Sequence, residues 1–285
     1  CVRFCTPGRL MKIFRCDTLQ HEETQTALEK LVRNRRGTAL TIGGFDGPHR
    51  GHQVLFDAVL DHAASHDLTP GVVTFTRSPG ALKNAEHYPG DVSTLNLRLS
   101  ALDRAGFDFV VLIDFSDDFG KMSGGVFFDI LVKTVRMRYV AVGPDFRCGH
   151  RLDTGTADID ARSRRDGFRF DSIRQVEQDG IRISSSAVRK AVLSADFALA
   201  ERLLGHPFLL DFNTPDWVPS GSGLEAERSL FTQILPPPGM YPAVLRVLEN
   251  REQKVRVEST GGTVRLVPCE NESLPGGEAI EAIQF

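Results

Sequence analysis

Two histidines and a run of glycines lie close together between residues 43 and 52. His49 and His52 are three residues apart, and Gly43, Gly44 and Gly47 precede them in the string GGFDGPHRGH. Glycines let backbone amides approach a ligand closely, and imidazole can donate hydrogen bonds to phosphoryl oxygens as negative charge builds on them. We therefore predict a phosphate-binding loop. The plainer alternative is that the glycines mark turns and the histidines lie on the surface.

A second candidate anion site lies at residues 183–189. Ser184, Ser185 and Ser186 stand where a helix is expected to begin, and Arg189 follows about one helical turn later. Hydroxyl groups at a helix start often only cap free backbone N–H groups. With those N–H groups and a guanidinium they can also bind a triphosphate. We favour the anion site.

A third segment, residues 142–149, follows an apolar strand-like run and contains Asp145, Phe146 and Arg147. In an open parallel sheet, ligands collect beyond the carboxyl ends of the strands, so this loop and the histidine loop are expected to face one pocket. Taken singly, Phe146 is more typical of a core aromatic residue and Arg147 of a solvated charge.

The elements that position these residues follow from the hydrophobic pattern. Apolar segments alternate with helical patterns, which predicts an α/β fold with a parallel sheet and helices on its faces. The expected strands are residues 38–42, 69–75, 107–113, 139–142 and 169–176, and the expected helices are 52–65, 125–134 and one beginning near Ser185. Because Met11 directly precedes another strand-like segment, residues 1–10 are left out of the predicted fold.

The pattern changes after Pro207, where prolines and a Gly/Ser stretch interrupt any helix. Short strands are expected at residues 241–248, 254–258, 263–267 and 279–285, forming a small antiparallel sheet or partial barrel. We predict a nucleotide-binding domain over residues 11–206 and a small, mainly β domain over residues 207–285.

Composition limits the ligand and the compartment. The net charge of −3 and the pI near 6.3 provide no bulk attraction to nucleic acid or anionic membranes, so a small ligand is expected. The five cysteines, Cys1, Cys5, Cys16, Cys148 and Cys269, are scattered and odd in number, which argues against a disulfide framework or a zinc site. We expect a cytoplasmic protein; the oligomeric state is open.

The three motifs together resemble a known family. The string GGFDGPHRGHQ resembles the HxGH signature of the nucleotidyltransferase superfamily in the form carried by bacterial FAD synthetases. The segment ISSSAVR is similar to that family's second nucleotide motif, and VGPDFRCG is similar to its VGxDFRFG stretch, with Cys148 in place of the usual Phe. The resemblance covers roughly residues 11–208 and ends at LLGHPF, which is similar to the family's LLGRPY.

The resemblance implies a Rossmann-like fold, ATP with Mg²⁺, FMN as the nucleophile, and FAD with pyrophosphate as products. It implies catalytic roles for His49, His52 and Arg189. The ATP-binding residues would be Gly44, Phe45, Asp46, Gly47, His49, His52, Ser184, Ser185, Ser186 and Arg189. The FMN-binding residues would be Phe75, Arg77, Asp145, Phe146 and Arg147.

Two regions depart from the family pattern. The loop TFTRSP at residues 74–79 stands where TFEPHP is usual, so Ser78 replaces a His and Arg77 could supply the missing positive charge. Most bacterial members also carry a riboflavin kinase barrel with a GxPTxN-type motif. This chain has only the string PGMY at residues 238–241, which is similar to part of the kinase's PxxGVYA segment. We expect a degenerate module without riboflavin kinase activity.

The leading hypothesis is therefore AMP transfer from ATP to FMN. Two alternatives remain at this stage: an adenylyl or cytidylyl transferase for another phosphorylated acceptor, and a flavin-binding regulatory protein that kept the pocket but lost turnover.

Overall fold

The computed structural model of the chain describes residues 10–78, 80–81, 88–115, 117–178, 180–248, 251–269 and 272–285. Cys1, Cys5 and the rest of residues 1–9 lie outside the described residues, as does Pro79 of the TFTRSP loop. The chain divides into two units. The first comprises residues up to 45, 51–82 and 99–176, and the second comprises residues 46–50, 83–98 and 177–285.

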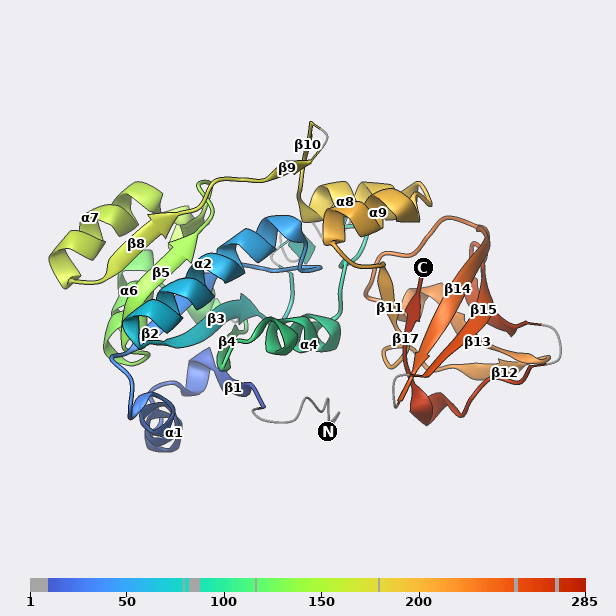
Figure 1. Cartoon of the computed structure of the whole chain (residues 1–285), viewed down its shortest axis with the longest axis horizontal. Helices are drawn as coiled ribbons and strands as arrows, with labels where there is room; N and C mark the ends of the chain where they lie inside the picture. Colours follow the sequence, from blue (N-terminus) through green and yellow to red (C-terminus); the bar gives the residue numbers. More distant parts are fainter. Residues whose placement is uncertain are drawn as a thin grey trace. The chain divides into compact units, whose positions relative to one another are not determined.

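The first unit is built on a six-stranded sheet in which every strand pair is parallel (Figure 1). Every residue of strands β2 and β4 is buried, as expected where helices cover both faces of a parallel sheet. The spatial order of the strands is β1-β4-β3-β2-β5-β8. Their bounds are β1 (Lys12–Arg15), β2 (Thr38–Ile42), β3 (Thr69–Phe75), β4 (Phe109–Ile113), β5 (Met137–Val142) and β8 (Arg169–Ser172).

Helices cover both faces of this sheet, and successive side chains of each strand point to opposite faces. Leu40 and Ile42 of β2 face the core cluster that also contains Leu28, Phe128 and Ile159 from three helices. On the other face, His62 of α2 stacks on Tyr139 of β5 with ring centroids 3.8 Å apart. The helices wholly or mainly in this unit are α1 (Glu22–Val32), α2 (Arg50–His66), α4 (Leu95–Ala105), α5 (Asp117–Gly120), α6 (Gly124–Lys133) and α7 (Thr156–Asp166).

The strand order contains a topological switch point between β2 and β5. From β2 the chain proceeds outward through β3 to β4, and it then crosses back to β5 on the other side of β2. Loops that leave adjacent strands in opposite directions open a crevice at the carboxyl edge of such a sheet. The loops that follow Ile42 and Val142 are therefore the expected ligand-binding edge of the first unit.

The sequence-based elements of this unit are largely confirmed. Strands 38–42 and 69–75 match β2 and β3, the segment after Met11 forms β1, and the predicted helices correspond to α2 and α6. The prediction of a strand over residues 169–176 was too long. Strand β8 pairs only with β5, whose last residue Val142 lies opposite Ser172, so there is no strand beyond that point to pair with.

The described part of the second unit includes helices α8 (Ser185–Leu193) and α9 (Phe197–Leu204) and a seven-stranded sheet. Both helices follow the short hairpin of β9 (Glu177–Gln178) and β10 (Ile181–Arg182). The sheet is antiparallel throughout, in the order β11-β17-β14-β15-β16-β13-β12. Its strands are β11 (Leu209–Asp211), β12 (Val218–Ser220), β13 (Gly223–Glu227), β14 (Gly239–Val247), β15 (Arg251–Ser259), β16 (Thr263–Pro268) and β17 (Ile280–Gln284).

This sheet, residues 209–285, is called the β module below. Its buried core includes Leu245, Val257, Leu266 and Ile283, and the first three alternate with more exposed residues along their strands. Phe197 of α9 stacks on Phe285 with centroids 4.7 Å apart, which joins the helix to the sheet. The predicted antiparallel β region is thus confirmed, and a division of domains near residue 207 stays a prediction.

Candidate active site

The loop that follows β2 is fixed to the neighbouring strand β3 within the first unit. Gly43 donates its backbone N–H to the carbonyl of Val73 at 3.0 Å. Thr74 donates its hydroxyl to the carbonyl of Gly44 at 3.1 Å. Because both bonds come from the loop's first two residues, the glycine-rich segment leaves the sheet edge in a defined direction.

Phe45 has a different position from the one expected of a residue that contacts ATP through its side chain. It has a left-handed backbone with φ of 46°, and only 2% of the residue is exposed. Its ring packs edge-on against His52 at 5.1 Å and against Phe56 at 5.2 Å. The buried ring therefore orients His52, and a contact between Phe45 and ATP stays a prediction.

The two histidines stand at the start of helix α2, which begins at Arg50. His52 is half-buried in the first turn, whereas His49 directly precedes the helix and is 6% exposed. Burial lowers the pKa of His49 to about 4. His49 is therefore an uncharged imidazole at neutral pH, able to donate one hydrogen bond beside a helix N-terminus that favours anions.

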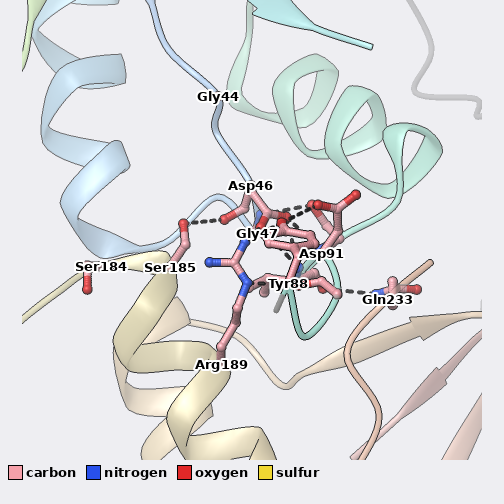
Figure 2. Close-up of polar contacts among 12 residues, drawn as sticks. Gly44, Asp46, Gly47, Tyr88, Asp91, Ser184, Ser185, Arg189 and Gln233 are labelled. Atoms are coloured by element: carbon pink, nitrogen blue, oxygen red, sulfur yellow. Dashed lines mark hydrogen bonds and ion pairs between the residues drawn. The ribbon is translucent and has the colours of Figure 1, made fainter. Parts of the chain in front are cut away.

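Asp46 is the centre of a polar network within the second unit (Figure 2). Its carboxylate accepts hydrogen bonds from the backbone N–H of Val92 at 2.9 Å and of Ser93 at 3.0 Å, and it forms an ion pair with Arg189. Ser185 donates its hydroxyl to the Asp46 carbonyl at 2.7 Å. The first and second motifs, about 140 residues apart in the sequence, thus bind each other directly.

The electrostatics of this network balance burial against pairing. Burial raises the pKa of the Asp46 carboxyl, and the Arg189 guanidinium with the N–H groups of Ser93 and Val92 acts in the opposite direction. Arg189 also donates through Nε to the carbonyl of Gly90 at 2.8 Å and through Nη2 to the Tyr88 hydroxyl at 2.6 Å. The guanidinium carbon lies 5.0 Å from the centroid of the Tyr88 ring. The arginine is consequently held in one orientation by three kinds of contact.

Gly47 meets a steric requirement of the same network. Its φ is +59°, and a Cβ built on it would lie 2.2 Å from Cγ1 of Val92. Its N–H donates to the Ser93 hydroxyl at 2.8 Å. Only glycine allows residues 46–47 and 92–93 to approach so closely.

The three serines have separate positions. Ser184 caps α8, because its hydroxyl accepts a hydrogen bond from the Ala187 N–H at 3.2 Å. Ser185 binds Asp46 as described, and Ser186 is exposed in the first helical turn. The capping role is therefore present for Ser184, and the binding of a triphosphate by these residues stays a prediction.

The residues expected to bind FMN lie at the carboxyl edge of the first unit. Phe75 ends β3 and stacks on Phe115 at 4.7 Å, while Arg77 is exposed. Phe146 is half-buried against the main core. Asp145 is exposed and accepts a hydrogen bond from Gln175 at 3.0 Å, and exposed Arg147 donates to the Leu152 carbonyl at 3.0 Å. Their roles toward FMN stay predictions.

Sequence reasoning missed the segment of residues 88–94 that surrounds Asp46 and Arg189. It contributes Tyr88, the Gly90 carbonyl and the N–H groups of residues 92 and 93. It also missed Arg98, which is 1% exposed and whose pKa burial lowers while Asp46 and Asp91 raise it. These residues belong to no motif, and the only sequence signal is the turn-forming pair Pro89-Gly90.

The described residues contain no group of three or more His, Cys, Asp or Glu side chains placed to hold a metal ion. Within the same residues, no helix has the length and apolarity needed to cross a membrane.

The parallel sheet with its switch point, its glycine-rich β2–α2 loop and the histidines at the start of α2 define the class of Rossmann-like nucleotide-binding folds. A crystal structure described as a macrolide-efflux protein from Streptococcus pneumoniae shares this fold. The TM-score is 0.72 at 21% identity, over 87% of this chain and 83% of that one.

Sequence comparison narrows the class to a family. Residues 31–187 match the FAD synthetase family, and the chain belongs to it. The chain is 35% identical over 177 residues to a bifunctional riboflavin kinase/FMN adenylyltransferase of Escherichia coli K12, covering 62% of this chain and 56% of that protein. The Haemophilus influenzae protein of the same description is 33% identical over 182 residues, covering 64% and 59%. The match therefore spans less than two thirds of these relatives.

Proposed function

We propose that this chain transfers the adenylyl group of ATP to the phosphate of FMN, forming FAD and pyrophosphate. Membership of the FAD synthetase family supports this activity, as do the FMN adenylyltransferases that share about a third of its aligned residues. The ligand-binding edge of the first unit is consistent with it, because nucleotides bind at such switch points.

The observation that carries the proposal is the direct binding of the two candidate nucleotide motifs through Asp46, Ser185 and Arg189. A lone HxGH string is also explained by turn glycines and surface histidines, and a lone serine cluster is also explained by helix capping. Their association fixes the start of α8 and the Arg189 guanidinium against the loop that leads into α2. A fixed polar environment of this kind can stabilise charge developing on phosphoryl oxygens.

In the proposed reaction a phosphate oxygen of FMN attacks the α-phosphorus of ATP. The bond from that phosphorus to the bridging oxygen of the β-phosphate breaks, and pyrophosphate leaves with the electron pair. The protein forms no covalent bond; it aligns the reactants and stabilises charge. His49 and His52 would donate hydrogen bonds to the phosphates, residues 44–47 would bind nucleotide through backbone groups, and Arg189 with the serines of α8 would hold the departing pyrophosphate.

On the acceptor side we propose that Phe75 and Phe146 contact the flavin ring and that Arg77 and Arg147 contact its phosphate. The arginines are exposed and can reorient to meet a ligand, since long charged side chains keep much rotamer freedom at the surface. Asp145 would act with them as a polar contact. Because the family's usual residues are replaced at positions 77 and 78, the proposed FMN-binding residues depart further from the family pattern than the proposed ATP-binding residues do.

Magnesium would enter with ATP as part of the substrate. Mg²⁺ keeps several waters and commonly binds substrate phosphates with one or two carboxylates. It would neutralise phosphate charge when bound. The chain's own residues would then provide the remaining donors to the triphosphate.

We further propose that the chain lacks riboflavin kinase activity and acts in the cytosol. The β module keeps an antiparallel sheet, yet residues 207–285 contain no GxPTxN string. Its role would then be other than phosphoryl transfer to riboflavin.

The proposal is tested by incubating the protein with ATP, Mg²⁺ and either FMN or riboflavin, and resolving all flavins by chromatography. We expect FAD from FMN and no FMN from riboflavin. Absence of FAD with tight FMN binding would instead indicate a flavin-binding protein without turnover, and FMN formed from riboflavin would refute the loss of kinase activity.

A further inference from the structure

The segment of residues 88–94, called the strap below, contacts the nucleotide motifs on one side. Backbone N–H groups of Val92 and Ser93 bind the Asp46 carboxylate, and the Gly90 carbonyl accepts from Arg189. The Tyr88 hydroxyl accepts from Arg189 and donates to Asp91. The orientation of Arg189 and of the loop at Asp46 therefore depends on where the strap lies.

On its other side the strap is bound to the β module of the same unit. The N–H of Asp91 donates to the Thr232 carbonyl at 2.9 Å, and the N–H of Ile234 donates to the Asp91 carbonyl at 2.8 Å. The backbones come so close that a Cβ on Gly90, whose φ is +118°, would lie 2.7 Å from the nitrogen of Ile234. The hydroxyl of Thr94 also donates to Asp211 of β11.

The side chain of Gln233, a residue of the β module, also joins the module to the strap (Figure 2). Its Nε2 donates to the Val92 carbonyl and to the Leu209 carbonyl, both at 2.9 Å, and its Oε1 accepts from the Asp211 N–H at 2.7 Å. The residue is 4% exposed. Both amide hydrogens and the amide oxygen are thus used, and removing them would leave buried backbone groups without these partners.

Both backbone polar groups of Val92 form hydrogen bonds. Its N–H binds Asp46, and its carbonyl binds Gln233. A displacement of the strap at this residue changes the hydrogen bonds of Asp46, and through Asp46 it changes the ion pair with Arg189. A continuous chain of contacts accordingly runs from the β module to the arginine.

We propose that Gln233 is a positioning residue for nucleotide binding and that the β module supports adenylyl transfer by holding the strap against Asp46 and Arg189. This inference rests on the proposed function, since it assumes that this part of the molecule binds ATP. In this proposal the β module has a structural role in adenylyl transfer at the two nucleotide motifs. The module needs no ligand of its own for that role.

The test replaces Gln233 with methionine, which keeps the length and removes all three hydrogen bonds. The matched control is Gln253→Met, because Gln253 lies on β15 of the same module and bonds to Glu272 and Ser273 instead of the strap. Steady-state kinetics would vary ATP and FMN separately, and calorimetry would measure binding of a non-hydrolysable ATP analogue well below the melting temperature.

For Gln233→Met we expect about a tenfold rise in both the KM for ATP and the dissociation constant of the analogue, with the KM for FMN within about twofold, whereas Gln253→Met leaves all three unchanged. A merely structural role would lower the folded fraction and kcat and would not raise one KM selectively. Unchanged ATP parameters, or equal losses for both substrates, would overturn the proposal.

Two further outcomes are separable. If Gln233→Met fails to fold, Thr94→Val removes the strap hydroxyl's bond to Asp211 together with the bond that this hydroxyl accepts from the Leu97 N–H in the first turn of α4. The variant is expected to raise the analogue's dissociation constant by about threefold; no change would count against the strap. If the wild-type protein binds the analogue but forms no FAD, the proposed function fails and the ratio of analogue affinities still decides the role of Gln233. A wild-type protein that does not bind the analogue would overturn both.

Discussion

The residues expected to bind ATP and those expected to bind FMN differ in how firmly the fold holds them. Asp46 and His49 are 5% and 6% exposed, and the Arg189 side chain is 13% exposed and contacts Asp46, Gly90 and Tyr88. Arg77 and Asp145 are exposed on loops, and exposed Arg147 begins the two-residue strand β6 (Arg147–Cys148). The residues expected to bind ATP are thus held in place without a ligand, and we propose that those expected to bind FMN gain much of their order when the ligand binds. Substitutions of the residues expected to bind ATP should therefore lower activity more than substitutions of the residues expected to bind FMN.

The largest expected effect comes from removing a donor on the nucleotide side. Arg189→Ala and His52→Ala should each lower the rate of FAD formation by about 100- to 1,000-fold, because each removes a group that we propose stabilises developing charge. Single-turnover kinetics with saturating ATP and FMN measures this loss. Arg202→Ala on α9 and His66→Ala at the end of α2 are exposed controls of the same residue types and should retain wild-type rates. Near wild-type rates in the two test variants would remove the distinction between the two sides.

A smaller but distinctive effect is expected in the pH dependence of stability. The folded pKa of His49 is lowered to about 4, so its stabilising contribution is complete above the unfolded pKa near 6.5 and is lost as the pH falls toward 4. The free energy of unfolding should thus fall by about 3 kcal/mol more between pH 7 and pH 4 than it would without this group.

Chemical denaturation of the wild-type protein and of His49→Asn at several pH values would measure that difference. The variant should show a shallower decline on the acid side, and His206→Asn, which alters an exposed histidine, should follow the wild-type curve. Parallel curves for wild type and His49→Asn would mean that His49 is not a buried neutral imidazole.

The smallest effect is expected on the acceptor side. Arg147→Ala should raise the KM for FMN by about threefold to tenfold with little change in the KM for ATP, because the contact proposed for this exposed guanidinium would be screened by solvent. Initial rates over a range of FMN concentrations measure it, and Arg164→Ala, an exposed arginine on α7, is the control. A loss as large as that of Arg189→Ala would show that both sides are equally preorganised.

The sequence predicted the parts of the molecule that depend on local patterns. Strands such as β2 and β3 are short apolar runs between turn-forming residues, and α2 and α6 follow a helical apolar stripe, so these elements and the α/β class followed from residue types alone. The end of β8 could not be predicted in this way, because it depends on where its single neighbour β5 stops.

Local sequence patterns likewise predicted only part of the candidate site. The glycines, the histidines and Arg189 belong to motifs, whereas the strap and Gln233 do not. The bond from Gln233 to Val92 joins residues 141 positions apart, and its partners are backbone groups that any sequence possesses. Likewise, nothing in the string GGFDG indicates that the Phe45 ring is buried against α2, since that follows from a left-handed backbone at one residue.

The central claim is the transfer of the adenylyl group to FMN, and parallel reactions with α-labelled and γ-labelled ATP test it most directly. With FMN and Mg²⁺ present, the label from the α-phosphate should appear in FAD, and the label from the γ-phosphate should appear in pyrophosphate. Retention of the α-label in ADP or ATP while the γ-label appears on a flavin would contradict the account, because that result would identify a phosphoryl transferase instead.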